Sequence, residues 1–295
     1  MMSSVARLGS NGQTSHVPRR VWGLIRACHP EPAVAVTAVT VLLAAGAGHG
    51  PRGLAAVGGT ILASQLAVGW SNDWLDAGRD AAVGRRDKPV PAGLLGRRTL
   101  GVAALLATLG TPLLALSLNP AAAACAIAAL VSGLLYNWPL KSTPLSVLPY
   151  AVSFGMLPAC VVLALPGAPT PPVWLPVAGA LLGAGAHFAN ALPDLDDDAR
   201  TGVRGLPHRL GPDRSALAAG GLLLAATAVL VFGPAGAPSW AGWAAAGTAV
   251  AILPLGWYVG RPRPGRPGRP VAAFRAVMVI ALIDVALLVL GGRLA

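Results

Sequence analysis

Nine apolar stretches, each long enough to cross a lipid bilayer, constrain the fold of this chain more than any other feature. A hydrocarbon core of about 30 Å takes about 20 apolar residues in a helix, and helices satisfy their own backbone hydrogen bonds in lipid. Only 11% of the 295 residues are charged, against about a quarter in soluble domains. We therefore expect an all-α, polytopic membrane protein with about nine transmembrane helices. The stretches cover residues 32–49, 53–72, 100–117, 119–137, 145–166, 173–192, 214–233, 237–258 and 271–291.

The positions of Lys and Arg predict the orientation. If the N-terminus lies in the cytoplasm, 20 of the 22 basic residues fall in cytoplasmic segments, and only Arg52 and Arg293 fall outside. This agrees with the positive-inside rule. It also accounts for the net charge of +11, so we do not expect nucleic-acid binding. The expected location is the cell membrane, with the N-terminus in the cytoplasm.

The chain divides into a short tail and one membrane domain. Residues 1–30 contain no continuous apolar core before a small-residue cleavage site, so we expect a polar cytoplasmic tail rather than a signal peptide. Residues 31–295 are expected to form a single transmembrane domain.

The acidic residues are concentrated in two segments. Of eleven Asp and Glu residues, four lie between Asp73 and Asp87 and five between Asp194 and Asp213. Both segments follow apolar stretches that are predicted to run in the same direction. A shift of 118 positions superposes them on the pattern NxxxDxxxDxxxGxRxxP, which starts at Asn72 in the first copy. The match predicts an internal repeat or two sites with one role.

Helical spacing predicts what each segment presents. Residues four apart share a helix face, so Asn72, Asp76 and Asp80 are expected on one side, with Asp73 beside them. In the second segment Asn190, Asp194 and Asp198 have the same spacing; Asp197 is expected close to that face and Asp196 away from it.

Clustered carboxylates repel one another, so a positive partner is expected. Hard oxygen ligands without paired His or Cys favour Mg²⁺, which completes its coordination with water and substrate phosphates. Two facing acidic segments therefore suggest a diphosphate bridged by metal ions. The alternative is that both segments are solvated loops whose acids pair with nearby arginines.

These motifs resemble those of the UbiA family of intramembrane prenyltransferases. The family's NDxxDxxxD motif with a basic, Pro-rich continuation matches NDWLDAGRDAAVGRRDKPVPAG from Asn72, and its DxxxD motif with Gly and a basic residue matches 194–204. The segment YNWPLK at 136–141 resembles the family's Tyr-and-Lys loop. The resemblance covers nearly the whole chain.

The resemblance implies a helix bundle around a central cavity, in which Mg²⁺ binds a polyprenyl diphosphate for transfer to an acceptor, expected to be aromatic. The implied metal ligands are Asp73, Asp76, Asp80, Asp194, Asp197 and Asp198. The implied catalytic residues are Asp76, Asp194 and Lys141. The implied substrate-binding residues are Asn72, Arg85, Arg86, Lys88, Tyr136, Lys141, His187, Asn190 and Arg204.

Several assignments have alternatives. His187 lies one helical turn before Asn190 and is expected to contact the acceptor or remove a proton, or else to bond a neighbouring helix. Tyr136 or Trp74 is expected to face a carbocation, or else to lie at the membrane interface. Arg26 and His29 are expected at the cavity mouth or at lipid headgroups.

Two other functions fit parts of the sequence. A membrane terpene cyclase of the same fold would use the same diphosphate and metal ions without an acceptor. An ion-coupled transporter would place its acids near mid-membrane. The acids here are predicted at helix ends among arginines, which favours prenyl transfer.

Overall fold

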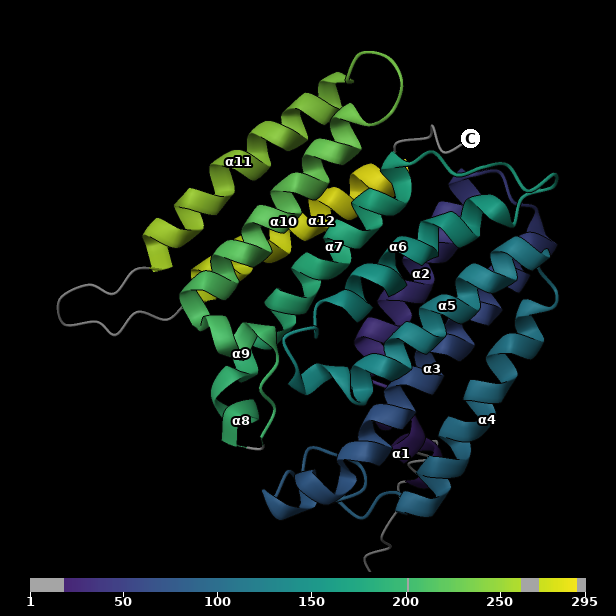
Figure 1. Ribbon diagram of the computed structural model, residues 1–295, viewed down its shortest axis with the longest axis vertical. Helices are drawn as coiled ribbons and strands as arrows, with labels where there is room; N and C mark the ends of the chain where they lie inside the picture. Colours follow the sequence, from purple (N-terminus) through teal and green to yellow (C-terminus); the bar gives the residue numbers. More distant parts are fainter. Residues whose placement is uncertain (1–18, 201, 261–270, 291–295) are drawn as a thin grey trace, which may run out of the picture.

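The computed structural model describes residues 19–200, 202–260 and 271–290, in which the regular structure is helical (Figure 1). Within these segments, nine helices of 16 residues or more coincide with the nine apolar stretches, which confirms the predicted all-α architecture. They are α2 (Pro30–Gly46), α3 (Pro51–Ala82), α4 (Arg97–Ala115), α5 (Pro120–Asn137), α6 (Leu148–Leu163), α7 (Trp174–Ala191), α10 (Pro212–Phe232), α11 (Trp240–Gly260) and α12 (Val271–Leu290).

Not all of these helices meet the full requirement for a membrane span. By length and hydropathy, α3, α4, α5 and α10 can each cross a bilayer among the described residues. Helix α1 (Arg19–Ala27) and α2 meet the requirement together, bent by 65° at a short break. Helix α6 and the described part of α11 are shorter apolar helices. The chain is thus an integral membrane protein with several spans.

Helices that follow one another in the chain pack side by side, as α3 does against α4, α6 against α7, and α11 against α12. Small residues allow the closest approaches. A side chain at Gly179 or Gly183 of α7 would collide with the backbone oxygen of Phe154 or Tyr150 in α6. Glycine at such contacts is typical of helices packed within membranes.

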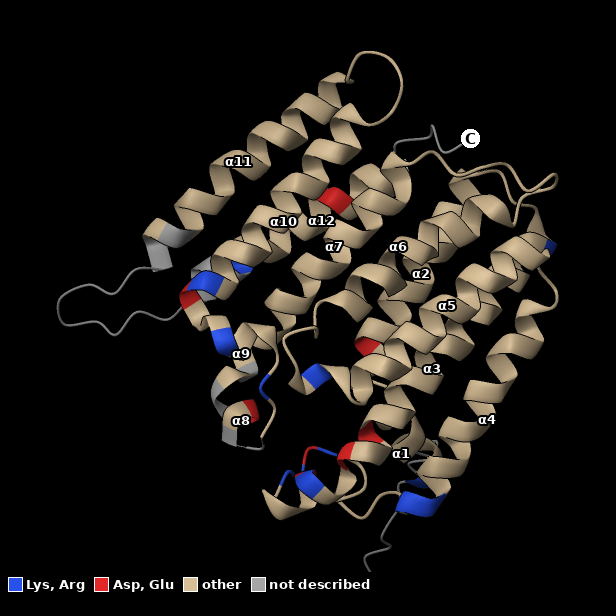
Figure 2. Ribbon diagram, in the orientation of Figure 1, with Lys and Arg blue, Asp and Glu red and all other residues tan. Residues whose placement is uncertain are grey.

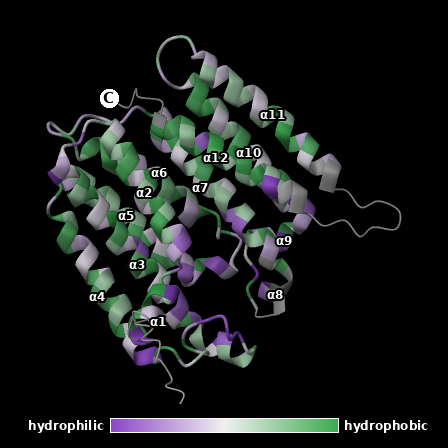
Figure 3. Ribbon diagram, turned by 180° about the vertical axis from the view of Figure 1, so that it is seen from behind, coloured by the Kyte–Doolittle hydropathy of each residue, from purple (hydrophilic) through white to green (hydrophobic). Residues whose placement is uncertain are grey.

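Charged residues collect at one end of the bundle, around α1, the end of α3, and the short helices α8 (Leu195–Arg200) and α9 (Leu206–Leu210) (Figure 2). In Figure 3, hydrophobic residues predominate along the long helices. Helix α3 has 32 residues and is therefore about 48 Å long. Since this exceeds a hydrocarbon core of about 30 Å, its last turns carry the first acidic segment beyond the apolar region.

The second acidic segment is not a continuous α-helix. Helix α7 ends at Ala191, a 3₁₀ turn η2 follows (Leu192–Asp194), and α8 begins at Leu195. Pro193 lies in this turn, where it has no N–H to donate to a helical hydrogen bond. The even four-residue spacing assumed for Asn190, Asp194 and Asp198 is interrupted by this turn, and their shared face stays a prediction because the side chain of Asp194 lies outside what the structure describes.

Both acidic segments nevertheless end in the same way. Gly84 and Gly202 have positive φ, of 72° and 82°. The residue after each glycine donates its N–H to the carbonyl oxygen of the last acid of the pattern, at 3.0 Å to Asp80 in one copy and 3.0 Å to Asp198 in the other. This is the Schellman arrangement that ends a helix at glycine. The repeated glycine is thus explained by local structure.

Candidate active site

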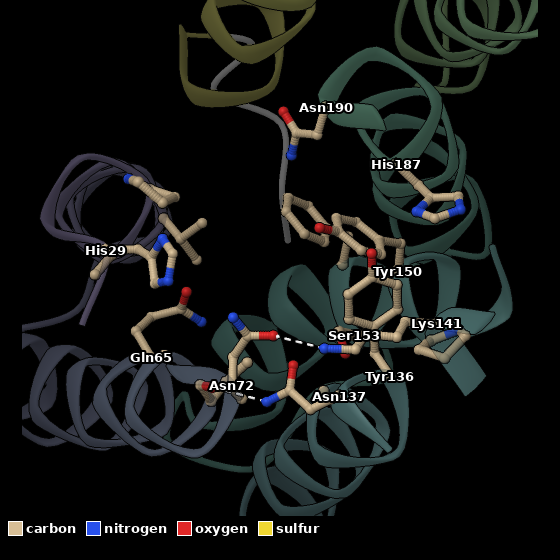
Figure 4. A pocket seen from close by; sticks show the side chains of 18 of the residues that line it. His29, Gln65, Asn72, Tyr136, Asn137, Lys141, Tyr150, Ser153, His187 and Asn190 are labelled. Atoms are coloured by element: carbon tan, nitrogen blue, oxygen red, sulfur yellow. Dashed lines mark hydrogen bonds between the residues drawn. The ribbon is translucent and has the colours of Figure 1, made fainter. Parts of the chain in front are cut away.

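A cavity of about 420 Å³ lies among α2, α3, α5, α6 and α7, and the segment from α8 to α9 contributes to its lining. Six of the predicted site residues line it, and they come from both acidic segments, α5, the turn after α5, and α7. Figure 4 shows Asn72, Tyr136 and Lys141 on one part of the wall, and Asn190 and His187 on another. The six are Asn72, Tyr136, Lys141, His187, Asn190 and Asp198.

Lys141 joins the first acidic segment to the cavity. It lies in the 3₁₀ turn η1 (Leu140–Ser142), and its Nζ donates to both carboxylate oxygens of Asp76 at 2.6 Å and to Asn72 Oδ1 at 3.3 Å. The side chains of Lys141 and Asp76 are only 12% and 13% exposed. Burial lowers the pKa of Lys141, whereas the Asp76 carboxylate acts in the opposite direction. Arg79, 2.8 Å from Asp76 Oδ2, adds a second cation.

Asp73 has a separate set of cationic partners. Its Oδ1 lies 2.8 Å from His29 Nε2 and accepts a hydrogen bond from Lys88 Nζ at 2.8 Å. His29 lines the cavity, which confirms its predicted place, and has a left-handed backbone (φ 53°) at the break between α1 and α2. The second oxygen, Asp73 Oδ2, is buried and has no hydrogen-bond partner among the described residues. Such a buried, unpartnered oxygen suits a cation.

The remaining predicted residues are distributed around this centre. Asp80 is buried at the end of α3 and is not among the residues that line the cavity. Arg85 pairs with Asp87 at 2.9 Å in the following loop, and this hydrogen bond holds the pKa of the Asp87 carboxyl below its usual range. Arg86 and Arg204 are exposed.

The second acidic segment contributes Asn190 and Asp198 to the cavity wall. Asp198 Oδ2 lies 3.4 Å from His208 Nε2. The positions of the Asp194, Asp196 and Asp197 side chains lie outside what the structure describes. Among the described side chains, no three His, Cys, Asp or Glu residues are arranged to hold a metal ion. The acidic and amide side chains of the site offer oxygen ligands, which Mg²⁺ prefers, and His29, His187 and His208 line the same cavity.

Trp74 is the aromatic candidate that lies elsewhere. It packs beneath Arg97 of α4, with the guanidinium carbon 5.5 Å from the ring centroid, and it is not among the residues that line the cavity. Tyr136 does line it, and its ring meets that of Tyr150 edge to face at 5.0 Å.

Sequence reasoning missed several polar cavity residues, Tyr150 and His208 among them. Tyr150 is one of three tyrosines in the chain and lies inside an apolar stretch, which was the available signal. His208 lies ten residues after Asp198. Its contact with that acid depends on the reversal of the chain between α8 and α9, which spacing alone does not predict.

The fold and the cavity define an integral membrane protein whose acidic segments converge on a polar cavity near one end of a helical bundle. A model of the UbiA prenyltransferase family matches residues 33–283. The chain belongs to this family, as its motifs predicted.

One curated relative is similar to part of this chain. Digeranylgeranylglyceryl phosphate synthase from Methanopyrus kandleri is 34% identical over 149 residues, which are 48% of this chain and 51% of the relative. The chain thus aligns with about half the length of this curated relative.

Solved structures share the fold at low identity. A UbiA homologue from Archaeoglobus fulgidus bound to GPP and Mg²⁺ superposes with a TM-score of 0.66 at 16% identity, over 90% of this chain and 98% of the homologue. A structure described for digeranylgeranylglyceryl phosphate synthase in membranes gives a TM-score of 0.70 at 14% identity, over 93% and 99%.

Proposed function

We propose that this protein transfers a prenyl group from a polyprenyl diphosphate to an acceptor bound in the central cavity. One observation carries the proposal. Asn72 from the first acidic segment, Asn190 and Asp198 from the second, and Lys141 from η1 line one cavity, and Lys141 also holds Asp76 of the first segment by a hydrogen bond. Family membership and the prenyl diphosphates bound to the Archaeoglobus fulgidus homologue support it.

Mg²⁺ is the proposed cofactor, with ligands among Asp73, Asp76, Asp80, Asp194, Asp197 and Asp198. Three observations support this assignment: Mg²⁺ is bound to the A. fulgidus homologue, the acids offer the carboxylate oxygens that Mg²⁺ prefers, and Asp73 Oδ2 is without a partner among the described residues. When bound, the metal supplies positive charge that offsets the charge of the leaving diphosphate.

The chain's own residues have three proposed roles. Lys141 donates hydrogen bonds to diphosphate oxygens as the allylic carbon–oxygen bond breaks, and Asp76 and Asn72 hold its ammonium in place. The Tyr136 and Tyr150 rings line the space beside it and suit an allylic cation. Arg85, Arg86, Lys88 and Arg204 add positive charge at the same end of the bundle.

Two acceptor classes are proposed for test. An aromatic ring is the acceptor that the sequence motifs favour. The Methanopyrus kandleri relative favours instead a glycerol-based lipid with a free hydroxyl, because its name describes a glyceryl phosphate that carries two geranylgeranyl groups. For either acceptor, we propose that the charged end of the bundle faces the cytoplasm, as the positive-inside rule predicts.

The test uses the full chain in lipid nanodiscs with Mg²⁺. Dimethylallyl, geranyl, farnesyl and geranylgeranyl diphosphates are each combined with 4-hydroxybenzoate, with 1,4-dihydroxy-2-naphthoate or with geranylgeranylglyceryl phosphate, and products are identified by mass spectrometry. A prenylated acceptor supports the proposal. A cyclised hydrocarbon formed without acceptor would support the terpene cyclase instead, and an unchanged diphosphate in every mixture would refute both.

A further inference from the structure

One ring nitrogen of His187 forms a hydrogen bond with the hydroxyl of Ser146. It lies on α7, its side chain is buried, and its Nε2 is 3.0 Å from Ser146 Oγ. Ser146 is fully buried and also accepts a hydrogen bond from the Leu206 N–H at 2.9 Å. This contact needs the absence of a side chain at Gly205, whose Cβ would lie 2.6 Å from the Lys141 backbone oxygen and 2.9 Å from Ser146 Oγ.

Hydrogen-bond accounting at Ser146 fixes the tautomer of His187. A serine hydroxyl has one proton to donate. Among the described residues, its hydrogen-bond partners are the Leu206 N–H, which is a donor, and His187 Nε2. If Nε2 carried the proton, the Ser146 hydroxyl would be buried with no acceptor, at the cost of an unmade hydrogen bond. Ser146 therefore donates to Nε2, and the proton of a neutral His187 is on Nδ1.

The Nδ1 atom is the part of the ring that can reach a ligand. His187 lines the cavity, and its Nδ1 is not among the buried, unpartnered polar atoms of the described chain. The surrounding wall is aromatic, with the Tyr150 ring centroid 4.9 Å away and the Tyr136 centroid 5.7 Å away (Figure 4). A neutral N–H among aromatic rings suits an oxygen of an organic molecule better than a diphosphate bearing several charges.

We infer that His187 binds the acceptor substrate by donating a hydrogen bond from Nδ1 to one of its oxygen atoms, with Ser146 as its positioning residue. The inference rests on the proposed function and gives His187 the role of donor, not of the base that removes a proton. A hydroxyl, carbonyl or carboxylate oxygen fits this donor, and an acceptor without oxygen does not.

The first test reads the tautomer without any substrate. The full chain with ¹⁵N-labelled histidine, in nanodiscs, is measured by NMR, and the His187 signal is assigned by its loss in His187→Asn. We expect the spectrum of an Nδ1–H tautomer, and Ser146→Ala should remove the preference for it. An Nε2–H tautomer in the wild type would overturn the inference.

The second test replaces His187 with Asn or with Gln, whose side-chain NH₂ groups lie at different positions of the former ring. Asn puts its NH₂ near the position of Nδ1, whereas Gln puts it near Nε2. With whichever of the three acceptors above gives product, His187→Gln should raise the acceptor KM about tenfold, the equivalent of one hydrogen bond, and His187→Asn should stay within about threefold. The matched control is His49→Gln, at the other end of the bundle, where His49 Nε2 contacts the Val161 carbonyl oxygen.

The outcomes separate the two proposals. Heat stabilisation by geranyl diphosphate with Mg²⁺ should be equal in His187→Gln and the wild type, because the proposed diphosphate ligands, Lys141 and the acidic residues, are unchanged in the variant. An equal acceptor KM in Gln, Asn and wild-type proteins would overturn the inference while leaving prenyl transfer intact. If the wild type prenylates no acceptor, the proposed function and the assignment of this substrate both fail, although the NMR spectrum still decides the tautomer.

Discussion

Replacing Lys141 with Met tests whether the buried Lys141–Asp76 pair is a working part of the site. Met keeps much of the side-chain volume and removes the ammonium, whose Nζ donates to both Asp76 oxygens at 2.6 Å. We expect Lys141→Met to lower kcat/KM for the prenyl diphosphate at least about 100-fold, which is the typical effect of removing one preorganised donor from a developing anion.

The effect on stability follows from what remains around Asp76. Breaking a buried ion pair by removing one partner costs about 3–5 kcal/mol. Because Arg79 stays 2.8 Å from Asp76 Oδ2, the carboxylate keeps one cation, and we expect a smaller loss of about 1–3 kcal/mol. Asp76→Asn should cost a similar amount, because it leaves the Lys141 ammonium buried with Asn72 as its acceptor.

A double-mutant cycle measures the coupling between the two residues. The double variant Lys141→Met with Asp76→Asn leaves neither charge unpaired, so its loss of stability should be smaller than the two single losses added together, by about 1–3 kcal/mol. Unfolding in mixed micelles with increasing SDS provides the free energies, and Arg98→Met, an exposed charge on α4, is the control. Additive losses within about 0.5 kcal/mol, or a Lys141→Met variant with full activity, would refute the account of this pair.

Three further predictions concern other parts of the molecule. Gly205→Ala should lower kcat/KM at least about tenfold, because its Cβ would collide with the Lys141 backbone oxygen. Gly221→Ala is the control: its Cβ would meet no atom within 4 Å, so kcat/KM should stay within about twofold. Equal effects of the two substitutions would contradict the close approach at Gly205. Treatment with EDTA should abolish prenyl transfer and Mg²⁺ or Mn²⁺ should restore it, while full activity after exhaustive chelation would rule out the metal. Thr227→Val should lower the free energy of unfolding in SDS by about 1–3 kcal/mol, because Thr227 Oγ1 is the hydrogen-bond partner of the buried Asp284. Thr227→Ser keeps the hydroxyl and should retain most of this free energy. An unchanged free energy of unfolding in Thr227→Val would contradict this role.

The long helices were predictable because lipid leaves few alternatives. A run of apolar residues must satisfy its backbone internally, so the stretches at 53–72 and 119–137 could be assigned as helices without packing information. The first acidic segment was predictable for the same reason, since α3 continues through Asn72 and Asp76 without a break. Family membership then followed from the motifs.

The partners of the site residues could not be predicted from sequence. Four-residue spacing assumes a continuous α-helix from Asn190 to Asp198, whereas a 3₁₀ turn at Leu192–Asp194 interrupts it. The pairing of Asp76 with Lys141 joins positions 65 residues apart, and that of Asp73 with His29 joins positions 44 apart. Contacts of this kind depend on how α2, α3 and η1 meet, which periodicity does not encode.

The most direct measurement is a structure of the full chain in lipid nanodiscs with Mn²⁺ and an uncleavable thio-analogue of geranyl diphosphate. The account predicts that one diphosphate lies in the central cavity, with metal density ligated by Asp76 from α3 and by at least one acid from 194–198, and that Lys141 contacts a phosphate oxygen. A diphosphate held by only one acidic segment, or bound outside the cavity lined by Asn72 and Asn190, would contradict the shared site.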